Sequence, residues 1–178
     1  MKNVVNIIND MIANNLFFVN RINYDMNALK LRLVQDEQSN KVIFFYIYSN
    51  WRLSKDNKII NSSFKYPHEQ YYGNKASHRR SFLKYCGSTR YLEDNAIEKI
   101  EIDNKTKDLK VFWSTGELLE AFCFESNSTS YHVYDQINGH TYDVMYGKIN
   151  KEFASPEGGC DGHESTRHTK RAAADPHG

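Results

Sequence analysis

The stretch that decides the fold is residues 97–124, which read IEKIEIDNKTKDLKVFWSTGELLEAFCF. Apolar residues alternate with polar ones on either side of the polar segment 103–108, and a short turn, Ser114-Thr115-Gly116, separates the second of these runs from a third at 118–124. Alternation with a period of two is typical of β-strands, and Gly116 supplies the positive φ that a three-residue hairpin turn needs. The stretch therefore predicts three antiparallel strands joined by two hairpins.

The same strand pattern continues on both sides of this stretch. Downstream, Asn138-Gly139, the strongest short hairpin signal, lies between two alternating runs. Upstream, alternating leucines at 29–33 lead through a polar turn into the continuously apolar run 42–48, which is typical of a central strand. A further turn at 54–58 lies between two short apolar segments. Together these runs predict an antiparallel meander of about seven to nine strands.

Two helices are expected to accompany the sheet. After Asn3, a possible N-cap, a stripe of apolar residues at helical spacing predicts a short N-terminal helix that packs on the sheet: Val4, Ile7, Ile8, Met11 and Ile12. The segment 66–90 is the one long part of residues 1–150 without strand alternation, and it predicts a second helix that could end at Cys86-Gly87. The expected fold class is therefore α+β: an antiparallel β-sheet meander with an N-terminal helix and a helical basic insertion at about 66–90.

Length and composition are consistent with one domain. The 178 residues contain 23 Lys and Arg against 22 Asp and Glu. Residues 151–178 contain no Ile, Leu, Val, Met, Tyr, Trp or Asn, and they include short sequences that cloning sites encode, such as Glu152-Phe153. We therefore expect a single domain at 1–150, followed by a vector-derived or disordered tail. That tail holds a loose group of cysteine and histidine that is not expected to bind metal, because no second cysteine pair accompanies it: Cys160, His163 and His168.

Neither a membrane span nor a secretory signal is indicated. A transmembrane helix needs about 20 consecutive apolar residues, whereas the longest apolar run, Val42 to Tyr48, has the length of a strand. The first apolar stretch is interrupted by Asn and Asp, unlike the apolar core of a signal peptide. We therefore expect a cytoplasmic protein in which Cys86 and Cys123 are reduced.

The segment 65–90 is the part of the chain that most strongly suggests a function. It contains six basic residues and one acidic residue, with five aromatic residues interleaved. On a helix, Arg79, Arg80 and Lys84 would share a solvent-facing side, bordered by Tyr72. We expect a partner-binding surface made of these four residues and Lys75, which binds either the acidic face of a protein or the phosphates of RNA or DNA. The alternative is a solvated helix whose charges serve solubility.

Signals for catalysis are weaker. Residues 81–84 match the Ser-x-x-Lys pattern of serine acylating enzymes, but the companion motifs of those enzymes are missing. His132, His140 and Asp143 could pair for acid–base chemistry or bind a metal, yet cross-strand polar pairing explains both histidines, which flank a turn at strand positions. Two pairs of carboxylates are expected at solvated loop or strand edges: Glu93-Asp94, and Glu117 with Glu120. We therefore expect neither an enzyme nor a cofactor nor a bound metal.

Several strand and turn positions resemble a known group of proteins. They are Trp51-Arg52-Leu53, Asp56 and Ile59-Ile60-Asn61-Ser62, then Ile97, Ile100, Ile102, Asp108-Leu109, Val111, Trp113, Gly116, Leu119-Glu120 and Phe122. These positions, which cover about half of residues 1–150, are similar to those of the small β-rich immunity proteins of bacterial polymorphic-toxin systems. The resemblance implies a cytoplasmic protein that binds and neutralises one cognate toxin and has no catalytic residues.

The charge of the chain argues against a nuclease as the toxin. Immunity proteins directed at nucleases tend to be acidic, whereas residues 1–150 hold 19 basic and 17 acidic side chains, so we expect a toxin of another class. The leading hypothesis is a non-enzymatic protein-binding module. The alternatives are a nucleic-acid-binding accessory protein of bacterial or phage origin, which would use the segment 65–90, and a small enzyme that would use the hairpin of His132 and His140.

Overall fold

The computed structural model describes residues 6, 17–25, 28–35, 42–68, 73–124 and 128–153. Within these ranges the chain forms eleven β-strands, the short 3-10 helix η1 and the α-helix α2. Their bounds are β1 (Phe17–Asp25), β2 (Ala28–Val34), β3 (Val42–Ile47), β4 (Trp51–Lys55), β5 (Lys58–Ser62), η1 (Ser63–Lys65), α2 (Lys75–Arg90), β6 (Ala96–Ile102), β7 (Leu109–Trp113), β8 (Leu118–Ala121), β9 (Tyr131–Asp135), β10 (His140–Met145) and β11 (Lys148–Phe153).

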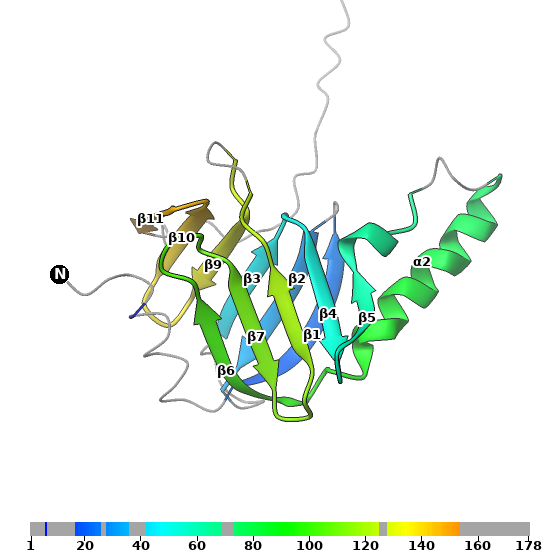
Figure 1. Cartoon of the computed structure of the whole chain (residues 1–178), viewed down its shortest axis with the longest axis horizontal. Helices are drawn as coiled ribbons and strands as arrows, with labels where there is room; N and C mark the ends of the chain where they lie inside the picture. Colours follow the sequence, from blue (N-terminus) through cyan, green and yellow to red (C-terminus); the bar gives the residue numbers. More distant parts are fainter. Residues whose placement is uncertain are drawn as a thin grey trace, which may run out of the picture.

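The strands form an antiparallel sheet whose order departs from the order of the chain. From one edge to the other the order is β11-β10-β9-β3-β2-β1-β6-β7-β8-β4-β5. β1 and β6 share only two register pairs, Phe17↔Ile97 and Phe18↔Ala96. Figure 1 shows β6, β7 and β4 in front of β1, β2 and β3, so that the two halves of the sheet face each other across this narrow joint.

The hydrophobic core lies between these two halves. Leu29, Leu31 and Leu33 alternate along β2 and are all buried. From the other half, Val111 and Trp113 of β7 are buried in the same way. Because successive side chains of a strand point to opposite faces, the period-two pattern of the sequence selects the residues that enter this core.

The hairpins predicted from the sequence are present. β6 and β7 pair on either side of the loop 103–108, and β9 and β10 pair across the Asn138-Gly139 turn. Gly116 and Gly139 have φ angles of 93° and 66°, in the left-handed region that favours glycine. The apolar run 42–48 contains β3, which lies between β2 and β9 inside the sheet, as expected for a central strand. A β-rich antiparallel fold with a helix is thereby confirmed.

Other expectations about the sheet were wrong. The strands do not form one continuous meander, because β8 pairs with β4 and β9 pairs with β3. These pairings join segments that are distant in sequence, so no local pattern announces them. The described strands also exceed nine, because β1 and β11, with the sequences FFVNRINYD and KINKEF, lack strict alternation. Finally, β11 continues to Phe153, three residues beyond the expected domain boundary at 150.

The helix in the basic segment is α2, which begins after Asn74. The side chain of this N-cap residue accepts a hydrogen bond of 2.9 Å from the backbone N–H of Ser77. An end at Gly87 was wrong, since α2 continues to Arg90. Its last turn is held by a hydrogen bond of 2.9 Å between the hydroxyls of Tyr24 and Thr89, a tertiary contact that outweighs the low helix propensity of glycine.

Some expectations fall outside the described residues. Apart from Asn6, the expected N-terminal helix lies there, as do Tyr72 and residues 154–178. Among the helices that the structure describes, none is both long enough and apolar enough to cross a membrane.

Candidate partner-binding surface

Four of the five residues expected to bind a partner lie on the exposed side of α2. Lys75 and Arg79 form one row at a spacing of four residues, and Arg80 and Lys84 form the neighbouring row. All four side chains are exposed. Leu83 continues the first row and is 57% exposed. We call the four basic residues and Leu83 together the cationic face of α2. Tyr72, which was also expected to bind the partner, lies outside the described part of the chain.

The opposite side of α2 fixes the helix to the sheet. Tyr85 is buried, and its hydroxyl donates a hydrogen bond of 3.2 Å to the carbonyl oxygen of Ser62 in β5. The side-chain amide of Asn61 donates to Ser88 Oγ at 2.7 Å and to the carbonyl oxygen of Tyr85 at 3.3 Å. Burial raises the pKa of the Tyr85 phenol far above its ordinary value. These contacts orient α2 so that the cationic face points away from the core, and Figure 1 shows α2 beside β5.

Aromatic packing adds to this attachment. The ring of Tyr85 lies 4.8 Å from that of Tyr24, 5.6 Å from that of Tyr66 and 6.4 Å from that of Trp51. Trp51, the first residue of β4, is buried. Tilted and edge-to-face arrangements of this kind stabilise the helix–sheet contact beyond the area that they bury.

The cation at the start of α2 does not serve the stability of the helix. The first turn contains no acidic residue and begins with Lys75. Positive charge at a helix N-terminus adds to the partial positive charge of the free N–H groups, whereas carboxylates there would stabilise the helix. The amino-acid sequence of α2, KASHRRSFLKYCGSTR, contains no Asp or Glu that could offset its basic residues.

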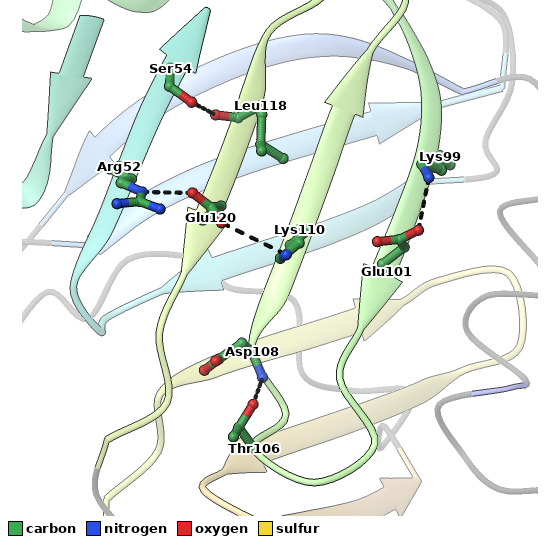
Figure 2. Close-up of polar contacts among 9 residues, drawn as sticks. All are labelled: Arg52, Ser54, Lys99, Glu101, Thr106, Asp108, Lys110, Leu118 and Glu120. Carbon is green, nitrogen blue, oxygen red and sulfur yellow. Dashed lines mark hydrogen bonds and ion pairs between the residues drawn. The ribbon is translucent and has the colours of Figure 1, made fainter. Parts of the chain in front are cut away.

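Two carboxylates expected to be solvated are instead buried. Glu117 and Glu120 are 2% and 8% exposed. The carboxylate of Glu120 lies 2.6 Å from Arg52 Nε and 3.8 Å from Lys110 Nζ, between β4 and β7 (Figure 2). Glu117 Oε1 lies 2.9 Å from Lys55 Nζ. The expectation that these carboxylates are solvated was wrong. Their partners Arg52 and Lys55 come from β4, which is far away in sequence, so the local sequence does not indicate these ion pairs.

The histidine hairpin forms cross-strand pairs. His132 of β9 and Asp143 of β10 are register partners, and the carboxylate oxygen Oδ1 of Asp143 is hydrogen-bonded to His132 Nδ1. The ring of Tyr48 meets that of His132 edge-on at 5.2 Å. His140 is the register partner of Asp135. The cross-strand polar pairing expected for these histidines is confirmed at His132.

The thiols of the described residues are poor nucleophiles at neutral pH. Cys86 and Cys123 are both free. Burial raises the pKa of Cys86, and it raises the pKa of Cys123 to about 11. Since the thiolate is the reactive form, both side chains remain in the unreactive thiol form at pH 7.

A second exposed surface, which the sequence analysis missed, lies where β4, β5, η1 and β8 meet. Three large apolar side chains are exposed there: Ile59 at 54%, Phe64 at 82% and Phe124 at 63%. They surround a hollow of about 320 Å³, which we call the aromatic hollow, and its lining includes Trp51, Arg52, Ile59, Phe64, Phe122 and Phe124.

The rings of the aromatic hollow are ordered by contacts with one another and with Arg52. The rings of Phe122 and Phe124 stack at 5.9 Å with an interplanar angle of 20°. The Arg52 guanidinium lies 5.3 Å from the centre of the Phe122 ring. The signal that could have revealed this surface is the period of two in Ala121-Phe122-Cys123-Phe124, which places both phenylalanines opposite buried Cys123.

Comparisons of this chain with protein-family models, curated proteins and solved structures found no match. The cationic face of α2 and the aromatic hollow are therefore the features of the molecule that bear on its function.

Proposed function

We propose that this chain is a non-enzymatic protein-binding module, similar in role to the immunity proteins of bacterial toxin systems. In this proposal the cationic face of α2 binds an acidic surface of a cognate toxin and thereby neutralises it. The observation that carries the proposal is the exposed Leu83 among Arg79, Arg80 and Lys84.

An exposed leucine among cations favours a protein partner. Its apolar surface gains about 25 cal/mol for each Å² that a partner covers. A protein surface offers apolar side chains next to carboxylates, whereas a nucleic-acid backbone offers phosphates and leaves the leucine without a counterpart. The planar guanidinium groups of Arg79 and Arg80 are suited to carboxylates, which they can bind with two parallel hydrogen bonds.

The residues that could have been catalytic all have contacts within the fold. His132 is paired with Asp143, Glu120 is bound by Arg52, and Glu117 is bound by Lys55. His132 and Glu120 therefore contribute to cross-strand contacts within the sheet, and Glu117 connects the turn before β8 to the end of β4.

The second candidate is a nucleic-acid-binding accessory protein of bacterial or phage origin. The observation that favours it is the sequence of α2, in which five Lys and Arg occur without an acidic residue. Such a protein would depend on phosphate contacts, and its affinity would fall steeply with salt. Leu83 would contribute little to that affinity.

The test compares partner binding by two double variants, each of which reverses two positive charges: one on α2 and one away from it. The partner is the protein encoded by the reading frame next to the gene, because an immunity protein is encoded beside its toxin. Arg79→Glu with Arg80→Glu should weaken its binding at least about tenfold, which is about 1.4 kcal/mol. The matched control is Lys105→Glu with Lys148→Glu, which reverses the same number of exposed charges in the loop between β6 and β7 and at the start of β11, and it should leave binding unchanged.

Leu83→Ala separates the two candidate functions. It should weaken binding of the protein partner by about fivefold, since truncation removes apolar area that the partner would cover. Binding of a 30-nucleotide single strand, measured at 50 and 200 mM salt, should be unaffected. If the oligonucleotide binds tightly at low salt, loses most of its affinity at high salt and ignores Leu83, the nucleic-acid function is correct. Growth inhibition by the neighbouring gene product, relieved by this chain, would independently support the immunity role.

A further inference from the structure

We infer that the aromatic hollow is a second contact site for a protein partner and that it accepts one aromatic side chain flanked by carboxylates. The inference rests on the proposed protein-binding function and specifies the chemistry of the partner segment. It concerns residues on β4, β5, η1 and the segment that follows β8, and none of them belongs to the cationic face of α2.

The shape of the aromatic hollow suits a single inserted side chain. Its volume of about 320 Å³ is at the lower end of the range for ligand sites, which is about 300 to 1,000 Å³. Phe64, Phe124 and Ile59 rise around it, each more than half exposed. Large apolar side chains that cluster around a concavity are typical of the centre of a protein interface, where an aromatic anchor is buried.

The edge of the sheet next to the aromatic hollow is closed to strand addition. β5 is the last strand in the sheet order. The carbonyl oxygen of Ile60 accepts a hydrogen bond of 3.1 Å from Lys65 Nζ, and that of Ser62 accepts one of 3.2 Å from the Tyr85 hydroxyl. An added strand would have to displace both donors, so a partner engages this region through an inserted side chain rather than through backbone pairing.

The charges around the aromatic hollow favour an acidic partner segment. Lys58 and Lys65 are exposed on β5 and η1, and Asp56 is exposed in the turn between β4 and β5. Glu120 is buried and already bound by Arg52 and Lys110. Among the described residues of this rim, Lys58 and Lys65 stand against the exposed carboxylate of Asp56, and this excess of positive charge complements carboxylates on either side of the inserted residue.

A stacked nucleobase fits the aromatic hollow less well. The Arg52 guanidinium already lies over the ring of Phe122. Its charge is balanced by Glu120 at 2.6 Å, which weakens its attraction for phosphate. Single-stranded nucleic acid is bound by open aromatic faces beside unbalanced cations. Here the cation on the Phe122 ring is balanced by Glu120, and Lys65 Nζ donates to the carbonyl oxygen of Ile60, so the observations favour a protein segment.

The experiment uses three fluorescein-labelled twelve-residue peptides and the full chain. The first peptide has one central Trp between Asp and Glu residues, the second has Ala in place of Trp, and the third has Lys in place of the acidic residues. Fluorescence anisotropy should show that the first peptide binds at least tenfold more tightly than either of the others. Equal binding of the first two peptides would mean that charge alone is recognised and would overturn the inference.

Variants locate the peptide on the chain. Phe64→Ala and Phe124→Ala should each weaken the first peptide at least fivefold, because both remove exposed ring surface from the rim, while circular dichroism should stay unchanged. Tyr146→Ala removes an exposed ring in the turn between β10 and β11 and should have no effect. Unchanged binding by the Phe64 and Phe124 variants would refute the site. A 12-nucleotide oligothymidine that competes with the peptide and depends equally on Phe64 would assign the hollow to nucleic acid instead.

Binding of the first peptide should not depend on the cationic face of α2. Arg79→Glu with Arg80→Glu should leave binding of the first peptide within threefold, because neither arginine lines the aromatic hollow. Loss of toxin binding in that double variant therefore tests the proposed function, whereas the peptide tests the hollow.

Discussion

Glu117 is almost completely buried, yet both of its carboxylate oxygens have donors. Lys55 Nζ lies 2.9 Å from Oε1, and the Thr115 hydroxyl donates to Oε2. Burial by itself would raise the pKa of Glu117, but the hydrogen bonds from Thr115 and Lys55 outweigh it, and the pKa lies below its ordinary value of 4.5. A group whose pKa is lower in the folded state stabilises the fold above its unfolded pKa, and it loses this contribution as the pH falls through its folded pKa.

Glu117→Gln should therefore destabilise the protein in a pH-dependent way. At pH 7 we expect a loss of about 1 to 2 kcal/mol in urea unfolding, since one charged hydrogen bond disappears while half-exposed Lys55 is rehydrated. The difference between the two proteins should shrink as the pH falls below 4.5 and then through the lower pKa of the folded wild-type carboxylate. Glu101→Gln is the matched control: it breaks the Lys99–Glu101 pair of 2.8 Å, which is half exposed on both sides, and should be neutral. A pH-independent difference would contradict this account of Glu117.

The burial and the ion-pair partners of such carboxylates could not be predicted from the sequence. Glu117 and Glu120 stand beside polar or apolar neighbours like any strand-end carboxylate, and their partners on β4 are 62 and 68 residues away. The alternation around Cys123, by contrast, is local, and it agrees with the burial of this cysteine. Local periodicity determines which face a side chain occupies, whereas the partner it meets there depends on strand order.

At the scale of single elements, α2 shows how tertiary contacts override a local signal. Gly87 suggests a helix end, but Tyr85, Ser88 and Thr89 hold the last turn against β1 and β5. Gly87 thus lies inside a helix, where glycine is entropically costly. A methyl group at this position would meet no atom within 4 Å.

Gly87→Ala should stabilise the protein by about 0.5 to 1 kcal/mol, because alanine reduces the freedom of the unfolded chain and fits the helical backbone. Gly116→Ala is the contrasting variant. It also meets no nearby atom, but its φ of 93° strains any residue with a side chain, so it should destabilise. Urea denaturation of both variants measures whether each substitution raises or lowers the free energy of unfolding. A destabilising Gly87→Ala would show that the segment is not helical at this position.

The hairpins were predictable from the sequence because their turns are local. Asn138-Gly139 and Gly116 specify their turns through backbone conformations that few other residues adopt. The pairings of β8 with β4 and of β9 with β3 were not predictable, because antiparallel ladders place no demand on sequence that distinguishes one apolar strand from another. The cationic residues of α2 were found from composition, whereas the aromatic hollow depends on strands brought together by these long-range pairings.

At the scale of the molecule, the sheet has two unlike ends. β5 is bordered by α2 and η1, and both proposed contact surfaces lie at that end. β11 forms the other edge and pairs with β10 at six positions, from Met145↔Lys148 to His140↔Phe153. Changes at the β11 end should therefore affect stability without affecting binding.

Two truncations test this separation and locate the domain boundary. Removal of residues 154–178 should leave the melting temperature unchanged, since that segment contains no large aliphatic residue. Removal of residues 151–178 also deletes the end of β11, including Lys151, whose Nζ lies 5.7 Å from the centre of the buried Tyr142 ring. We expect this deletion to cost about 1 to 2 kcal/mol, which lowers the melting temperature by about 2 to 8 °C. Both truncated proteins should bind the partner of the cationic face as tightly as the full chain. Equal melting temperatures for the two would place the boundary at 150 and show that the last three residues of β11 contribute nothing.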